Sequence, residues 1–264
     1  MKRGRSISRF PTQEPTPANP RALNRLLQAL PKADFEALRP HLQPVEMIKE
    51  TVLIEAGAPS THLYLPESGI ISMMVRLSEG QTIELAMIGR DSILGASAAF
   101  GDAISLSEAV VLQPGSAFVL DIASFRAAAD RSVAFRSLLS RHEQALLAET
   151  QQSAACNAAH SVEARLSRWL LRARELCDGE ALPLTQELLA RMIGVQRNAI
   201  SIVAHGLQQS GVIGYNRGHV EIYDPEGLEE TSCECFRVVK AHRDRLLEVT
   251  DQPPHGHGQA VTNR

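Results

Sequence analysis

The 264-residue sequence predicts an α+β protein with a β-rich N-terminal region, a long helix and a C-terminal winged helix-turn-helix. The first indication is a series of short apolar segments over residues 45–120, separated by glycines. The second is an unbroken helical periodicity over residues 133–160, and the third is a pair of short helices around Gly194 followed by a hairpin. The length favours two domains, because domains usually hold about 100–200 residues.

The N-terminal region has the pattern of a β-sandwich or barrel, because short strands alternate with turn signals. Segments 70–77 and 82–88 flank a turn that contains Gly80, and they predict a hairpin. Leucines at helical spacing over residues 21–42, interrupted by Pro31 and Pro40, predict two short helices before the strands. A parallel α/β sheet is excluded, since no helix of 10–15 residues separates the strands.

The long helix over residues 133–160 would extend about 42 Å at 1.5 Å per residue. One stripe of this helix is partly apolar and carries Leu138, Leu139, His142, Ala145 and Leu146. A long helix of this kind between two domains is typical of a dimer seam. We therefore expect a homodimer, with the seam strongest in the first half of the helix. The alternative is that the stripe packs against the chain's own N-terminal domain.

The C-terminal pattern predicts a helix that begins after the N-cap Thr185, a tight turn at Gly194, and a second helix over residues 196–209. Strands at 212–215 and 220–223 then form a small hairpin, the wing. In this geometry the start of the second helix enters the major groove of DNA. Its leading exposed residues would be Gln196, Arg197, Asn198 and Ser201.

These side chains suit double-stranded DNA, because arginine bonds guanine edges and asparagine or glutamine bonds adenine edges. Residues 188–220 contain no Asp or Glu, so this stretch does not repel phosphate. On the wing, Arg217 and His219 are placed to contact the phosphate backbone. The alternative interpretation of the same helix is a polar face exposed to solvent.

Residues 182–224, LPLTQELLARMIGVQRNAISIVAHGLQQSGVIGYNRGHVEIYD, resemble the DNA-binding domain of the Crp/Fnr superfamily of bacterial transcription regulators. IGRDSILG (88–95) resembles a turn of that superfamily's sensor. QSAACNAAH (152–160), ARLSRWLL (164–171) and SCECF (232–236) resemble one branch of it. The resemblance implies a double-stranded β-helix (jelly-roll) sensor, a dimerisation helix and a sequence-specific regulator that acts as a homodimer on a palindromic operator. RNA polymerase is then an expected partner.

The resemblance also divides the chain into domains. It implies a cyclic-nucleotide-binding-like sensor over residues 21–130, a dimerisation helix over 131–160 and a winged helix-turn-helix over 161–248. Residues 1–20 and 249–264 are expected to be a disordered arm and tail. Arg197 matches the superfamily's groove-reading arginine. Asn198 and Ile202 depart from its usual residues, so the base preference of other members does not transfer.

The sensor lacks the two charged anchors of a cyclic-nucleotide site. That pattern needs Gly-Glu for the ribose and Arg-Ser or Arg-Thr for the phosphate, and the corresponding residues are Gly95, Ala96, Ser97, Leu106 and Ser107. The glutamate and the arginine are both missing, and Glu108 would repel a phosphate. Cyclic AMP and cyclic GMP are therefore disfavoured. The small, apolar lining suits a small neutral effector or none, with Arg90 as the one alternative phosphate clamp.

The four cysteines, Cys156, Cys177, Cys233 and Cys235, do not form a disulfide framework, and a reducing cytoplasm is the expected location. An iron–sulfur cluster is disfavoured. In the superfamily members that this chain would then resemble, cysteines near the N-terminus and one in the sensor hold the cluster, and this sequence has no cysteine before Cys156. Cys233 and Cys235 are separated by one residue, whereas zinc ligands usually have two to four between them. Within a helix they would point apart, so no metal and no cofactor are predicted. Redox sensing is the remaining alternative.

No hydrolase, Walker or metalloprotease motif is present, so no catalytic residue is predicted and an enzyme is disfavoured. No apolar run approaches the roughly 20 residues that span a bilayer, so a membrane partner is not expected. Two alternative functions remain. One is a ligand-binding scaffold whose helix-turn-helix is vestigial or binds protein, and the other is an enzyme with a fused regulatory domain.

Overall fold

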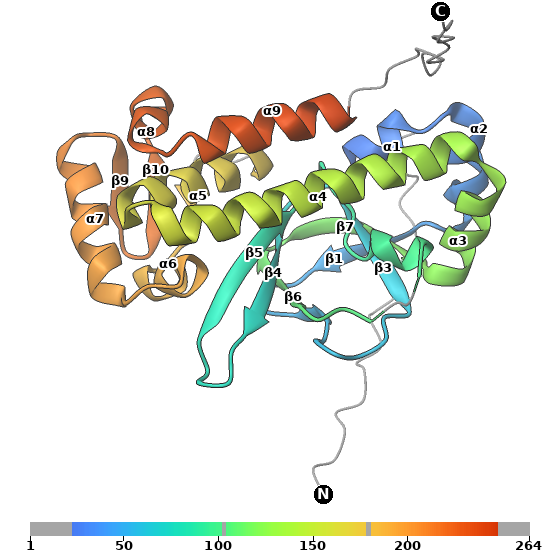
Figure 1. The fold of residues 1–264 in the computed structure, drawn as a ribbon, viewed down its shortest axis with the longest axis horizontal. Helices are drawn as coiled ribbons and strands as arrows, with labels where there is room; N and C mark the ends of the chain where they lie inside the picture. Colours follow the sequence, from blue (N-terminus) through green and yellow to red (C-terminus); the bar gives the residue numbers. More distant parts are fainter. Residues whose placement is uncertain (1–22, 102–103, 178–180, 248–264) are drawn as a thin grey trace, which may run out of the picture.

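A computed structural model describes residues 23–101, 104–177 and 181–247 (Figure 1). The predicted arm and tail lie outside these residues. The N-terminal domain begins with three short helices, α1 (Arg25–Ala29), α2 (Lys32–Leu38) and the 3-10 helix η1 (Arg39–His41). Seven strands follow: β1 (Gln43–Met47), β2 (Val52–Ile54), β3 (His62–Pro66), β4 (Ile70–Arg76), β5 (Thr82–Ile88), β6 (Glu108–Gln113) and β7 (Gly115–Asp121).

The seven strands form two antiparallel sheets with the orders β1-β7-β3 and β2-β6-β4-β5. Between β5 and β6 lies the 3-10 helix η2 (Ala96–Ala99). Buried residues from both sheets, including Met47, Ile71 and Val111, form the core between them. This two-layer arrangement confirms the predicted β-sandwich, and the β4–β5 hairpin turns at Gly80, whose φ is 88°.

Two helices connect the sensor to the rest of the chain: α3 (Ile122–Arg131) and α4 (Val133–Ala159). The long helix begins at the N-cap Ser132, whose side chain accepts a hydrogen bond from the amide of Phe135. In Figure 1, α4 runs along almost the whole molecule, above the sensor sheets at one end and beside the C-terminal helices at the other. The predicted helix over 133–160 is therefore confirmed to within one residue.

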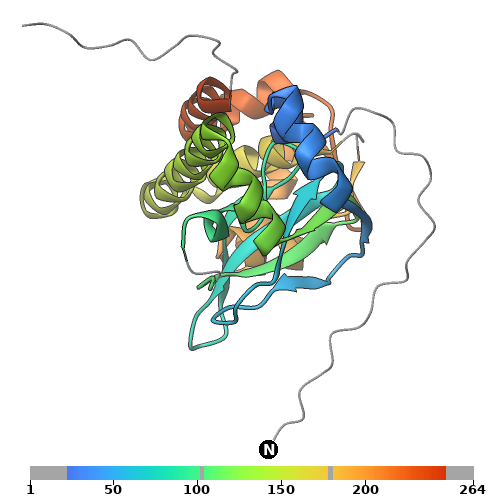
Figure 2. The same cartoon turned by 90° about the vertical axis from the view of Figure 1, so that its right-hand side faces the viewer.

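The C-terminal domain contains α5 (Val162–Leu176), β8 (Ala181–Leu182), α6 (Gln186–Ile193), α7 (Arg197–Gln209), β9 (Ile213–Asn216), β10 (His219–Ile222), α8 (Pro225–Thr231) and α9 (Cys235–Leu247). The wing is a three-stranded sheet in the order β8-β10-β9, one strand more than predicted. Helix α8 was not expected from the sequence. Helix α9 returns along α4, and the two helices lie side by side in both views (Figures 1 and 2).

The C-terminal domain packs directly against the outer face of the sensor's four-stranded sheet. One continuous hydrophobic core includes Met74 and Met87 of that sheet together with Leu166 and Met192 of the C-terminal helices. The two domains approach each other closely at Gly89, because a Cβ at that position would lie 2.6 Å from a methyl carbon of Leu176. In the part of the chain that the structure describes, no helix is long and apolar enough to cross a membrane.

Candidate DNA-binding surface and its link to the sensor

The helix-turn-helix forms as the sequence predicts. The hydroxyl of Thr185 accepts a hydrogen bond from the amide of Leu188 at 3.1 Å and caps α6. Gly194 ends α6 in the left-handed conformation with φ 71°, which a residue without a Cβ adopts without strain. The buried residues that fix α6 against α7 are Leu189, Met192, Ile193, Ile200 and Leu207.

The start of α7 presents polar side chains to solvent. Gln196, the N-cap, and the next two residues, Arg197 and Asn198, are all exposed. Ser201 is half-buried, and its hydroxyl donates to Gln186 Oε1 at 2.6 Å, so it ties α7 to α6. Helix α7 lies at the outer edge of the C-terminal domain, on the side away from the sensor (Figure 1).

Two further residues on the exposed face of α7 were not among the predicted contacts. Ile202 is 74% exposed, which is unusual for a large aliphatic side chain, and His205 is also exposed. Apolar side chains on a recognition helix contact the methyl group of thymine. The sequence could have identified Ile202 as a candidate contact, because it lies five residues after Arg197, at a position where the superfamily commonly has arginine.

The wing places a second set of polar side chains at the surface. Asn216 pairs with His219 across a two-residue turn formed by Arg217 and Gly218, with φ 48° and 81°. Positive φ at both central residues is typical of a tight hairpin turn. Arg217 and His219 are exposed, as predicted.

A buried carboxylate links this domain to the sensor. Glu84 of β5 accepts a hydrogen bond from Trp169 Nε1 of α5 at 2.6 Å, and Ser72 of β4 donates to its other oxygen. The Ser72 hydroxyl also lies 3.5 Å from Met192 Sδ of α6. Burial raises the pKa of Glu84 to about 7 and outweighs the opposite effect of the two hydrogen bonds. This pairing of Trp169 with Glu84 was not predicted from the sequence.

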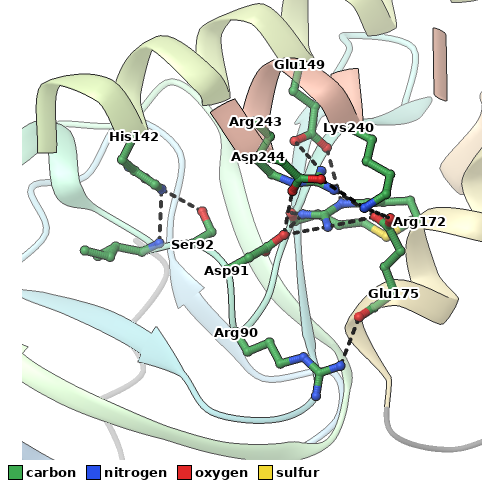
Figure 3. A network of polar contacts seen from close by, with 12 residues as sticks. Arg90, Asp91, Ser92, His142, Glu149, Arg172, Glu175, Lys240, Arg243 and Asp244 are labelled. Carbon is green, nitrogen blue, oxygen red and sulfur yellow. Dashed lines mark hydrogen bonds and ion pairs between the residues drawn. The ribbon is translucent and has the colours of Figure 1, made fainter. Parts of the chain in front are cut away.

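A buried charge network forms a second link (Figure 3). Arg172 of α5 donates two hydrogen bonds to Asp91, which follows β5, at 2.7 and 3.1 Å. Arg243 of α9 approaches the same carboxylate at 3.2 Å. Two further carboxylates, Glu149 of α4 and Glu175 of α5, form ion pairs with these arginines. Burial alone would raise the pKa of Asp91, but the charges of Arg172 and Arg243 outweigh it and hold that pKa well below its usual range.

Arg90 belongs to this interface and not to the predicted effector loop. Its guanidinium donates to the carbonyl oxygen of Glu175 at 3.2 Å (Figure 3). In the effector loop, Gly95 has φ 90° and Ala96 is buried, whereas Ser97 is exposed. The arginine considered as an alternative phosphate clamp therefore lies against the end of α5.

The second half of the predicted effector site is also dispersed. Leu106 is 88% exposed, so it does not line an enclosed cavity. Ser107 is buried and bonds to Ser105. Glu108 forms an ion pair with Arg76 at 3.2 Å. Arg126 of α3 is a cation next to this loop, and it donates to the carbonyl of Ala98 at 2.5 Å.

The residues predicted for the dimer seam face the sensor of the same protomer. Leu138, Leu139 and Ala145 are buried, and Leu146 is half-buried against the sandwich core. His142 Nε2 accepts from the amide of Ile93 at 3.1 Å and lies 2.7 Å from Ser92 Oγ (Figure 3). This placement matches the alternative interpretation of the sequence, in which the stripe packs against the chain's own N-terminal domain.

The expectation that Cys233 and Cys235 point apart is wrong. Cys233 precedes α9, which begins only at Cys235, so the pair does not share regular helical geometry. Both side chains turn towards Cys156 and His160 at the end of α4. The sequence signals that could have found this group were the Cys-x3-His spacing on α4 and the nearby Cys-x-Cys.

The family model of the cyclic nucleotide-binding domain matches residues 44–132, and that of the Crp-like helix-turn-helix domain matches residues 164–231. A comparison with curated proteins finds no match. Solved structures show the same fold. FixK2 from Bradyrhizobium japonicum has a TM-score of 0.64 at 15% identity, covering 73% of this chain and 98% of its own.

Two further structures support the same assignment of the fold. TTHA1359, a transcriptional regulator of the CRP/FNR family from Thermus thermophilus, has a TM-score of 0.59 at 21% identity, with coverages of 72% and 98%. The c-di-GMP responsive global regulator CLP from Xanthomonas campestris has a TM-score of 0.57 at 19% identity, also with coverages of 72% and 98%.

A β-sandwich sensor, a long connecting helix and an exposed recognition helix define a two-domain, DNA-binding transcription regulator. With both family models matched in the expected order, the chain belongs to the Crp/Fnr superfamily.

Proposed function

We propose that this regulator binds a palindromic operator in double-stranded DNA as a homodimer and reads it with α7. The observation that carries this proposal is the exposed start of α7, where Gln196, Arg197 and Asn198 project from a helix that Gly194 and a buried core hold in place. Arg197 is the candidate for a bidentate contact with guanine, and Asn198 for adenine. Ile202 adds an apolar contact with a thymine methyl group.

Around these base contacts, the surface suits the phosphate backbone. Arg217 and His219 on the wing are exposed, and no acidic residue occurs from 188 to 220. Wing cations of this kind strengthen binding to any duplex, because most of their contacts are to phosphate. The proposal therefore assigns sequence reading to α7 and general affinity to the wing.

We place the dimer seam on the exposed face of α4. Eight of its exposed positions follow alternating steps of four and three residues, which is the heptad spacing of a coiled coil: Val133, Ser137, Ser140, Gln144, Leu147, Gln151, Ala154 and Ala158. Leu147 is 57% exposed and Val133 is 75% exposed. A second copy would cover both. Two α7 helices related by this two-fold axis would read half-sites about 10–10.5 bp apart.

Cyclic AMP and cyclic GMP are not the effectors in this proposal. Ala96 and Leu106 provide neither the ribose-binding carboxylate nor the phosphate-binding guanidinium, and Arg90 is engaged with α5. The sensor then takes a small neutral ligand, or it transmits another signal through its contacts with α5. Contact with RNA polymerase is the expected route to transcription.

Selection of binding sites from random duplex DNA with the full-length protein tests the proposal. We expect an inverted repeat. Arg197→Ala should lower affinity for the selected site by about 1–3 kcal/mol per half-site, since each protomer loses a bidentate contact. Arg217→Ala should weaken selected and unrelated duplexes alike, with a shallower salt dependence.

Arg39→Ala is the matched control, because it removes an exposed arginine from the sensor, where Arg39 pairs with Glu36. It should leave DNA affinity unchanged. If no duplex is enriched and binding shows no salt dependence, the chain is a scaffold with a vestigial helix-turn-helix. If Arg197→Ala binds the operator as tightly as the wild-type protein does, the base contacts lie elsewhere.

A further inference from the structure

Four potential metal ligands meet where α4 ends and the C-terminal domain begins. Cys156 and His160 lie one helical turn apart at the end of α4, Cys233 lies in the connection between α8 and α9, and Cys235 is the first residue of α9. Their ligand atoms all lie within 4.8 Å of one another. The group thus joins two segments that are more than 70 residues apart in the sequence.

The distances between these atoms match a single tetrahedral ion. Cys156 Sγ lies 3.5 Å from Cys233 Sγ, and Cys235 Sγ lies 3.5 Å from His160 Nδ1. Around zinc, with Zn–S near 2.3 Å and Zn–N near 2.0 Å, neighbouring ligand atoms are about 3.8 Å (S···S) or about 3.5 Å (S···N) apart. An iron–sulfur cluster needs a wider opening, because several metal and sulfide atoms lie between its ligands.

The surroundings orient the ligands. His160 presents Nδ1 to the sulfur atoms, while its Nε2 lies 3.3 Å from Glu234 Oε1. A carboxylate on the second ring nitrogen is the usual partner of a metal-bound histidine, because it fixes the ring and its tautomer. Gln152 Nε2 donates to Cys235 Sγ at 3.1 Å, a bond that stabilises a thiolate. The three cysteines are buried, and Ala164 packs against them.

We propose that Cys156, His160, Cys233 and Cys235 bind one Zn²⁺ ion per chain. Three thiolates and one imidazole are a soft donor set that favours zinc over magnesium or calcium. All four positions of the tetrahedron come from the protein, so the site is structural, with no position open for catalysis. Binding releases three thiol protons to solvent and leaves the metal site with one negative charge.

The ion fixes the orientation of the DNA-binding domain. His160 is the C-cap of α4, and the next residue, Ser161, is the N-cap of α5, so the site lies directly on the hinge between the long helix and the winged domain. Coordination by Cys233 and Cys235 fastens the beginning of α9 to the same hinge. The zinc ion therefore sets the angle at which α7 is presented to DNA.

Metal analysis of the full-length protein, purified under reducing conditions, is the direct test. We expect about one zinc per chain. Replacement by Co²⁺ should give the intense visible bands of a tetrahedral site and thiolate-to-metal charge transfer in the near ultraviolet. Cys235→Ser and Cys156→Ser should abolish both signals. Cys177→Ser is the matched control, since Cys177 lies outside the cluster, and it should keep a full equivalent of zinc.

Glu234→Gln keeps the test informative if the cysteine variants fail to fold. Glu234 is largely exposed, so its replacement leaves the core intact. It should lower zinc affinity, measured by competition with a chromophoric chelator, by about 10–100-fold. Unchanged affinity would remove Glu234 from the site.

Three results would overturn the zinc proposal. Iron and inorganic sulfide in the purified protein would identify a cluster. A bond between Cys156 and Cys233, together with a reduced protein that takes up no Zn²⁺ or Co²⁺, would identify a thiol pair. Reduced, folded protein that binds neither ion in any preparation would show that the cluster is only a packing contact.

Discussion

The two halves of α4 hold their neighbours by different chemistry. The first half packs against the sensor through apolar side chains, such as Phe135, Leu138 and Leu139, which are almost fully buried. The second half faces the C-terminal domain through Glu149 and Cys156, which lie among charged groups and thiols. Apolar contacts do not respond to protons or ions, whereas ionic and thiol contacts do. Along α4, the contact with the sensor is therefore mainly apolar, whereas the contact with the winged domain includes groups that protons or ions can change.

The largest effect is expected from breaking the charge network at Asp91. Asp91→Ala removes the buried carboxylate that both Arg172 and Arg243 contact and leaves Glu149 and Glu175 as the remaining carboxylates of the described network, which should lower the free energy of unfolding by about 3–5 kcal/mol. Urea denaturation measures this loss. Glu36→Ala, which removes an exposed pair with Arg39, should change stability by less than about 1 kcal/mol. Equal losses in the two variants would contradict the interface assigned to Asp91.

Removing an apolar contact from the first half of α4 gives the matching test. Leu139 is completely buried against the sensor, so Leu139→Ala should cost about 2–5 kcal/mol through lost burial and a cavity. The loss should come from packing alone, because Leu139 lies in an apolar cluster with Phe135 and Leu138. Arg136→Ala, at an exposed position of the same helix outside the proposed dimer seam, should change stability by less than about 0.5 kcal/mol.

The contact between Glu84 and Trp169 should make the domain interface sensitive to pH. Burial raises the pKa of Glu84 from 4.5 to about 7, so the folded protein holds a proton that the unfolded chain has lost. This contribution is complete below pH 4.5 and is lost as the pH rises through 7. The free energy of unfolding should fall by about 3 kcal/mol across that window, at about 1.36 kcal/mol per pKa unit.

Trp169 is the only tryptophan in the chain, so its fluorescence reports this titration directly. The emission should change with a midpoint near pH 7, and Glu84→Gln, which keeps a neutral hydrogen-bonding group next to Trp169, should abolish the change. A midpoint below pH 5 in the wild-type protein would show that Glu84 is ionised under all neutral conditions.

The smallest effect on the protomer is expected on the exposed face of α4. Leu147→Asp replaces a side chain that is 57% exposed, so the secondary structure and the protomer's own packing should be preserved. In the proposed dimer the two new charges meet across the seam, and sedimentation equilibrium should show monomers. If Leu147→Asp remains dimeric, the dimer seam does not lie on this face of α4.

Local signals explain why the helix-turn-helix could be predicted so closely. The N-cap Thr185, the left-handed Gly194 and the apolar spacing of α6 and α7 each act within a few residues, and the structure places all of them as expected. The turn of the β4–β5 hairpin was predictable for the same reason, because it depends on the positive φ of Gly80. Such features depend on backbone geometry near one residue, which the sequence encodes directly.

Predictions that required knowledge of distant neighbours were less successful. The stripe of Leu138 and Leu139 was visible in the sequence, but periodicity gives an apolar face and not the surface that covers it. The effector residues Gly95 and Leu106 were placed together by resemblance, whereas Leu106 is almost fully exposed. Helix α8 was not predicted, although Pro225 lies in its first turn, where proline is favoured.

The sequence by itself determined the order of the domains, the long helix, the polar residues from Gln196 to Asn198 at the start of the second short helix and the absence of the charged nucleotide anchors. Only the tertiary structure decided which groups meet across the domains: Glu84 with Trp169, Asp91 with Arg172, and Cys156 with Cys233. The physical reason is that hydrogen bonds and metal coordination act over about 2–3 Å. Their partners are therefore set by how the chain packs and not by their spacing along it.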